Sequence, residues 1–248
     1  MAEKWLNRAK AVLDTEIQGL AAVRDKLDAS FVRALEILAG CTGRVVVTGL
    51  GKSGLVGRKI AATFSSTGTP AFFLHPVEGA HGDLGMIRRE DMVLAISNSG
   101  ETDELNNILP SLKSLSGGLV ALTGGLASTM ARLADVVIDT GVPREACPLG
   151  VAPTASTTAA LAVGDALAVC LIDWKAFALE DFQRFHPGGA LGQRLARRAG
   201  ELMRTAGLPV APEDASLAQA LETLNGGGLG CVCVLEVEIG RASCRERV

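Results

Sequence analysis

A glycine-rich segment beside a β-branched run has the composition of an anion-binding turn. Residues 45–48 read Val-Val-Val-Thr, residues 49–54 read Gly-Leu-Gly-Lys-Ser-Gly, and a helical pattern begins at Leu55. Glycines let the backbone turn sharply and bring its N–H groups close to an anion, and a helix N-terminus adds partial positive charge. Three glycines in six residues seldom serve packing alone, so this order of strand, loop and helix predicts a phosphate site.

A second polar loop follows the apolar run at 92–96, and it offers three hydroxyl groups. It reads Ser-Asn-Ser-Gly-Glu-Thr, with the hydroxyls on Ser97, Ser99 and Thr102. Hydroxyl and N–H groups are the donors that phosphate oxygens accept from. Taken alone, this loop is also an ordinary turn in which Thr102 caps a helix. Together with the first loop it favours phosphate binding, in one cleft framed by two strand ends.

The first loop also fits the fingerprint of dinucleotide-binding folds, G-x-G-x-x-G after a strand and before a helix. This fingerprint would indicate a nicotinamide oxidoreductase. The second predicted strand argues against that alternative, because it ends in His75 where a ribose-binding carboxylate is expected. The loop is not a Walker A motif, because Val46 stands where the first glycine belongs. Hydride transfer is therefore the weakest of the functions considered.

Acid–base chemistry could come from three histidines and two carboxylates near predicted strand ends. His75, His81 and His186 each lie beside Pro or Gly, and Glu104 and Glu145 follow the third and fifth predicted strands. An imidazole or carboxylate tuned toward neutral pH is what proton abstraction beside a carbonyl requires. The histidine spacing matches no standard zinc pattern, so we expect any metal bound there to be adventitious.

Alternating apolar runs predict the fold class. Two helices are expected within residues 5–38, with an N-cap near 28–30. Strands are expected at 45–50, 71–75, 92–97, 118–123 and 136–140, and helices between them at 55–66, 103–115 and 128–133. This alternation indicates an α/β protein with a doubly wound, five-stranded parallel sheet flanked by helices. Such sheets bind ligands outside the carboxyl ends of their strands, where both polar loops fall.

Residues 154–172 form a helical pattern that is apolar on nearly every side. A helix without a polar face is buried, and in a chain of this size a second subunit is the best cover. We therefore expect a homo-oligomer.

Composition excludes several other functions. The 248 residues carry 24 basic and 27 acidic side chains, a net charge of −3, without the basic cluster that nucleic-acid binding needs. The charged N-terminus is unlike a signal peptide, and no apolar run spans a bilayer without polar interruption. We expect a cytoplasmic protein that contacts neither nucleic acid nor membrane. Its six cysteines show no CxxC spacing, so neither a disulfide framework nor a zinc knuckle is predicted.

As a set, these motifs resemble the sugar isomerase (SIS) domain family and, more narrowly, the D-arabinose-5-phosphate isomerases within it. The resemblance covers residues 5 to about 235 and is specific as a set. The matching segments are residues 49–54, 75–85, 97–102, 145–154 and 186–192.

The resemblance implies reversible conversion of D-ribulose 5-phosphate to D-arabinose 5-phosphate, the first step toward Kdo for lipopolysaccharide or capsule. It also implies a homotetramer, no required cofactor, and an inhibitory zinc ion with His75 as a ligand. Matched position by position, the family's catalytic set falls on Lys52, Glu104, Glu145 and His186. The implied substrate-binding residues are Gly51, Ser53, His75, His81, Ser97, Ser99, Gly100 and Thr102.

This reaction passes through a cis-enediol, so it needs a base, a donor for the developing oxyanion and a clamp on the phosphate. The hydroxyls of the two loops suit the clamp, and Lys52 suits the oxyanion. Glu104, Glu145 and His186 all remain candidates for the base. An imidazole, of His81 or His186, suits the opening of the sugar ring.

The remainder of the chain is assigned to a second domain. We expect the SIS domain to occupy residues 1–200, and residues 201–248 resemble the beginning of a CBS module. Half a module cannot close its own core, so loose order and absence of CBS-type regulation are expected. Residues 238–248 fit no continuation of that module, and we interpret them as a sequence artefact. The alternative function is a non-catalytic SIS protein that senses phosphosugars, which has no need of Lys52, Glu145 and His186.

Overall fold

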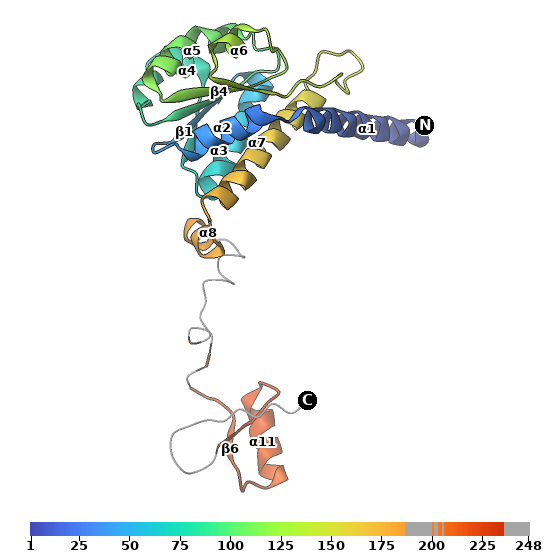
Figure 1. Ribbon diagram of the computed structural model, residues 1–248. Helices are drawn as coiled ribbons and strands as arrows, with labels where there is room; N and C mark the ends of the chain where they lie inside the picture. Colours follow the sequence, from blue (N-terminus) through green and yellow to red (C-terminus); the bar gives the residue numbers. More distant parts are fainter. Residues whose placement is uncertain (187–199, 201–202, 205, 236–248) are drawn as a thin grey trace. The chain divides into compact units, whose positions relative to one another are not determined.

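The computed structural model describes residues 1–186, 200, 203–204 and 206–235. The chain divides into two compact units, Met1–Gly192 and Gln193–Val248. A five-stranded parallel sheet in the order β2-β1-β3-β4-β5 forms the centre of the first unit (Figure 1). Its strands are β1 (Val45–Gly49), β2 (Ala71–Leu74), β3 (Met92–Ile96), β4 (Gly118–Thr123) and β5 (Val136–Asp139). The predicted doubly wound fold is confirmed, with the flavodoxin-like order that reverses direction between β1 and β3.

Helices cover both faces of this sheet. One core contains Val45 and Val47 of β1 and packs under α2 (Ala29–Ala39), α3 (Gly51–Ser66) and α7 (Ala155–Trp174). Val46, which points to the opposite face, joins a second core with α5 (Asp103–Leu115) and α6 (Thr129–Leu133). Because both faces are buried, each strand is a nearly continuous apolar run, which is why the sequence located all five strands to within a residue.

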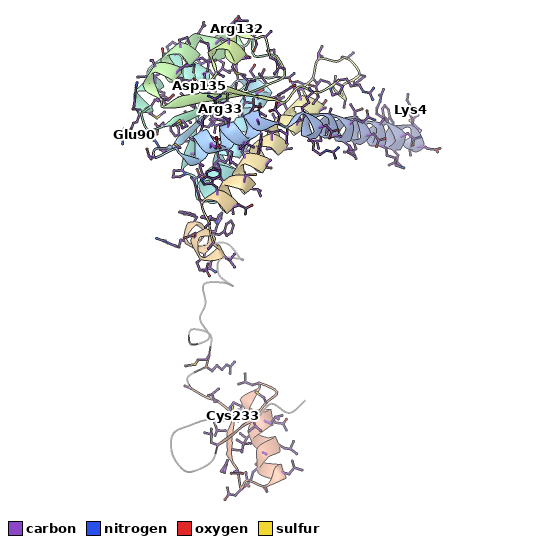
Figure 2. All side chains as sticks on the ribbon, viewed as in Figure 1. Lys4, Arg33, Glu90, Arg132, Asp135 and Cys233 are labelled. Atoms are coloured by element: carbon purple, nitrogen blue, oxygen red, sulfur yellow. The ribbon has the colours of Figure 1, made fainter. Side chains whose placement is uncertain are left out.

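The first helix, α1 (Ala2–Lys26), packs against α7 only through its C-terminal half. Thr15, Gly19 and Val23 are its buried residues, whereas residues 1–11 are exposed. Its N-terminal part projects from the body of the unit, with Lys4 near its outer end (Figures 1 and 2). The predicted cap between α1 and α2 is confirmed, because the carboxylate of Asp28 accepts a hydrogen bond from the backbone N–H of Ser30 at 2.8 Å.

Helix α7 is only partly covered within one chain, and its remaining cover was predicted to come from a second subunit. It buries one side, but Val169 and Trp174 are each 56% exposed. By length and composition it is the one helix of the described residues apolar enough to cross a membrane. Half of its most apolar window is buried against the rest of the unit, as in the core helix of a globular protein. Its cover by a second subunit stays a prediction.

Within residues 45–140 the structure differs from the predicted elements in two places. Helix α3 begins at Gly51 rather than Leu55, so residues 51–54 form its first turn instead of a loop, and that prediction was wrong. Gly51 has a φ of +58°, a conformation that favours glycine. Two short elements, α4 (Pro76–Ala80) and η1 (Asp83–Met86), also follow β2 without having been predicted. They are too short to produce a hydrophobic period.

The second unit contains β6 (Val210–Pro212), α11 (Leu217–Gly227) and β7 (Cys233–Leu235), with the two strands parallel. Of its described residues only Pro209 and Ala211 are buried, and α11 buries none of its residues. An open core of this kind is what half a module would have, and its assignment to a CBS module stays a prediction. The segment interpreted as an artefact, 238–248, lies outside the described residues.

We predict that replacing Gly54 by alanine destabilises the first unit. A Cβ at Gly54 would lie 2.7 Å from the backbone oxygen of Gly49, so β1 and α3 would have to separate. Overpacking of this kind costs about 1–3 kcal/mol, more than the roughly 1 kcal/mol that alanine gains in a helix. Thermal unfolding should show a lower Tm for Gly54→Ala and an unchanged one for Gly85→Ala, whose Cβ would meet nothing within 4 Å. Equal Tm values for Gly54→Ala and the parent would contradict this packing.

Candidate active site

A cavity of about 200 Å³ lies at the carboxyl ends of β3, β4 and β5. Ile96, Leu122 and Thr140 contribute from or just beyond these strands. The remaining lining comes from four other segments: the start of α3, the polar loop after β3, the segment around Glu145 and the start of α7. Their lining residues are Ser53, Val56, Asn98, Glu145, Gly150, Val151, Pro153, Ser156, Thr157 and Ala160. The cavity therefore lies where a doubly wound fold binds its ligand, and both predicted anion-binding segments reach it.

Glu145 is the carboxylate in this cavity, and it is held by the start of α7. Its Oε2 accepts hydrogen bonds from Thr154 N at 2.7 Å, Thr154 Oγ1 at 2.8 Å and Ser156 N at 3.3 Å. Orphan N–H groups at a helix N-terminus are natural partners for a carboxylate. Glu145 thereby accepts hydrogen bonds from the backbone N–H groups at the beginning of α7 while its side chain remains on the cavity wall.

This environment keeps Glu145 ionised. Partial burial opposes the charged form, but hydrogen bonding to Ser156 and Thr154 outweighs it, so the pKa of Glu145 lies below its ordinary value. A carboxylate that stays charged near neutral pH can accept a proton. Glu145 is therefore a charged carboxylate on the cavity wall, and its lowered pKa is a shift in the opposite direction from the tuning toward neutral pH that was expected of a base.

The polar loop after β3 is organised by its own hydroxyls. Ser97 Oγ lies 3.0 Å from Thr102 Oγ1 and accepts from Gly100 N at 3.0 Å, while Ser99 Oγ accepts from Glu101 N at 3.2 Å. Ser97 is buried, so its hydroxyl stabilises the loop from the interior of the protein. The residue of this loop on the cavity wall is Asn98, which sequence reasoning did not select.

Gly100 is required in this loop for two reasons. Its φ is +67°, and a Cβ there would collide with Ser128 Oγ, on the N-cap residue of α6. Its carbonyl accepts from Met130 N at 3.1 Å and from Asn106 Nδ2 at 3.1 Å. Close packing against α6 therefore fixes the loop's shape.

Lys52 and His75 lie together in a second, more open hollow of about 430 Å³, on the β2 side of α3. Gly51, Arg58 and Phe73 also line it. His75 caps α4, with its Nδ1 accepting from Val77 N at 3.3 Å. Because Ser53 lines the first cavity while Lys52 lines this hollow, the first turn of α3 contributes to both.

Seven predicted site residues line neither hollow, and four of them belong to the polar loop after β3: Ser97, Ser99, Gly100 and Thr102. The other three lie in α5 or at the ends of two other helices. Glu104 is exposed in the first turn of α5, and His81 is exposed at the end of α4. His186 ends α8 (Leu179–Phe185), where its ring stacks on Phe182 with centroids 3.9 Å apart and its Nδ1 lies 2.9 Å from Phe182 O. The other residues of the 186–192 motif lie outside the described residues.

One chain does not bring His186 to Glu145. Glu145 is bonded to the N-terminal end of α7, and α8 lies beyond the C-terminal end of that helix (Figure 1). Its 20 residues span about 30 Å as a helix. The implied catalytic set of Lys52, Glu104, Glu145 and His186 is therefore not assembled within a single copy.

Among the residues that the structure describes, no group of three or more His, Cys, Asp or Glu side chains is placed to hold a metal ion. His75 has its Nδ1 occupied by Val77 N–H. The inhibitory zinc ion expected there stays a prediction.

Sequence reasoning missed Thr154 and Ser156 as partners of Glu145. It placed Thr154 at the start of a helix and included it in a matching segment but gave it no role. Polar residues in the first turn of an otherwise apolar helix were the available signal, because N-terminal N–H groups need partners.

With the geometry established, comparison with known proteins identifies the class. The SIS domain family model matches residues 37–170. Arabinose 5-phosphate isomerase KdsD of Salmonella typhi is 50% identical over 228 residues, covering 92% of this chain and 70% of the relative. An Escherichia coli CFT073 protein solved in complex with arabinose 5-phosphate has 42% identity and a TM-score of 0.72, covering 75% of this chain and 98% of that structure.

A more distant match shows the fold alone. The sugar isomerase domain of an RpiR transcription factor from Sphaerobacter thermophilus has 19% identity and a TM-score of 0.57, covering 71% of this chain and 94% of that domain. The chain belongs to the SIS-domain family and, within it, to the arabinose 5-phosphate isomerases.

Proposed function

We propose that this protein is an aldose–ketose isomerase that interconverts D-ribulose 5-phosphate and D-arabinose 5-phosphate through a cis-enediol. Half of the aligned residues are shared with a relative named for this activity, and the related E. coli structure contains arabinose 5-phosphate. The reaction would be the first step toward Kdo for lipopolysaccharide or capsule. The observation that carries the proposal is the oriented, ionised Glu145 in a cavity that both anion-binding segments reach.

The cavity supports a division of roles. Glu145 is the favoured base, because it is ionised and lies on the cavity wall, whereas Glu104 is exposed outside it. The first turn of α3 and the loop at 97–102 would hold the phosphate through backbone N–H and hydroxyl groups. Lys52 lines the neighbouring hollow rather than this cavity, and we assign it to the oxyanion of the enediol because it is the cation next to Ser53 on the same turn.

His186 would complete this site from a second copy of the chain. A homo-oligomer is supported by the exposed apolar residues of α7 and α1, among them Val169, Trp174 and Ile17. An apolar groove between the two helices, about 400 Å³ in volume, continues that surface. The resemblance implies a tetramer.

We further propose that the reaction uses no cofactor, that zinc inhibits at His75, and that the enzyme works in the cytoplasm without nucleic acid or membrane partners. Cell fractionation followed by immunoblotting checks the location.

The second candidate function, a non-catalytic phosphosugar sensor, is favoured by one observation only: the fold is shared with a transcription factor. A sensor would bind the phosphosugar without converting it. Turnover therefore separates the two functions.

We predict that the purified protein converts D-ribulose 5-phosphate to D-arabinose 5-phosphate, and that Glu145→Gln lowers kcat by about 10²–10⁴-fold, since it removes the base. NMR of the product and of solvent-proton exchange at C1 and C2 measures both. Glu36→Gln is the control, because Glu36 is an exposed carboxylate on α2. Saturable binding without turnover by the parent would establish the sensor instead.

We predict that two inactive variants complement each other. If each site takes Glu145 from one copy and His186 from another, mixing Glu145→Gln with His186→Ala restores some intact sites. Random reassembly of equal amounts should recover about a quarter of the parent activity. An inactive mixture, under conditions where mass spectrometry shows exchanged subunits, would place both residues in one copy.

A further inference from the structure

Thr154 makes two of the three hydrogen bonds that reach Glu145. Its backbone N donates at 2.7 Å and its Oγ1 at 2.8 Å, both to Oε2, and the third comes from Ser156 N at 3.3 Å. All three converge on one oxygen. Within the described residues, Oε1 accepts no hydrogen bond, although Glu145 lies on the wall of the cavity.

The direction of the hydroxyl proton is fixed by a fourth group. Ala146 N donates to Thr154 Oγ1 at 2.9 Å. Since a backbone N–H can only donate, the hydroxyl accepts there and turns its own proton toward Glu145. Ala146 N–H donates to the Thr154 hydroxyl, which in turn donates to Glu145 Oε2. Both hydrogen bonds can run in this direction only when Oε2 carries no proton.

We propose that Thr154 is a positioning residue, which locks Oε2 of Glu145 so that Oε1 is the oxygen presented to the substrate. The consequence for catalysis rests on the proposed isomerase function, whereas the lock itself rests on the geometry alone. Thr154 would act through Glu145, and we assign it no contact with substrate.

Other charged groups near Glu145 do not account for its ionisation. Arg144 bonds to Gln18 at 3.5 Å, and Glu16 on α1 accepts from Thr158 Oγ1 at 3.0 Å. Within the part of the chain that the structure describes, the lowered pKa of Glu145 follows from hydrogen bonds that overcome burial.

The test uses Thr154→Val, which keeps the shape of the side chain and removes its hydroxyl. With glutamate labelled by ¹³C at the carboxyl carbon and the signal assigned through Glu145→Gln, NMR titration follows Glu145 directly. We expect its pKa to rise in Thr154→Val and to stay at the parent value in Thr154→Ser. Thr158→Val is the matched control, because it loses a hydrogen bond on the same helix to Glu16.

Kinetics provide the second readout. Removing the hydrogen bond from the Thr154 hydroxyl should lower kcat by about tenfold. It should also move the acidic limb of the pH profile of kcat/KM to higher pH, because Glu145 then becomes protonated at a higher pH as the pH falls. Thr154→Ser should restore both. Thr154→Ala serves the same comparison if the valine variant does not fold.

The outcomes separate the two proposals. A Glu145 titration that is the same in Thr154→Val and the parent would overturn the positioning role. A raised pKa in a protein whose parent form shows no turnover would support the lock and reject the isomerase function.

Discussion

The site depends on the parallel pairing of β1 with β3. These strands are adjacent in the sheet, and Gly49 pairs with Ile96 at their carboxyl ends. Successive helices leave opposite faces of the sheet from this point, α3 on one side and α5 on the other. The chain segments that follow β1 and β3 therefore lie next to each other and lead to opposite faces of the sheet. Their backbone N–H groups have no strand partner. An anionic ligand can satisfy these groups, and the polar residues after both strands suit it.

The pairing of β1 with β3 provides no carboxylate to the site, and the N-terminus of α7 holds one there. This N-terminus requires an acceptor, and Glu145, in the segment after β5, is that acceptor. The same contact that caps the helix orients the carboxylate and keeps it ionised. Stability and the catalytic role proposed for Glu145 thus depend on one set of hydrogen bonds. A substitution that weakens them is expected to affect both properties.

Much of this architecture could be predicted from sequence, for identifiable reasons. Strands buried on both faces leave continuous apolar runs, and the cap at Asp28 follows a local rule. The start of α3 was missed because glycine is a poor helix former, and two of the first four residues of this helix are glycine. Neither the lock on Glu145 nor the distance to His186 could be predicted, because both depend on how α7 packs in three dimensions.

The most direct test of this account is a crystal structure of the protein with D-arabinose 5-phosphate. We expect the phosphate to accept hydrogen bonds from the first turn of α3 and from the loop at 97–102. The C1–C2 end of the sugar should lie within hydrogen-bonding reach of Glu145 Oε1. A phosphate bound away from both segments, or reacting carbons remote from Glu145, would contradict the account.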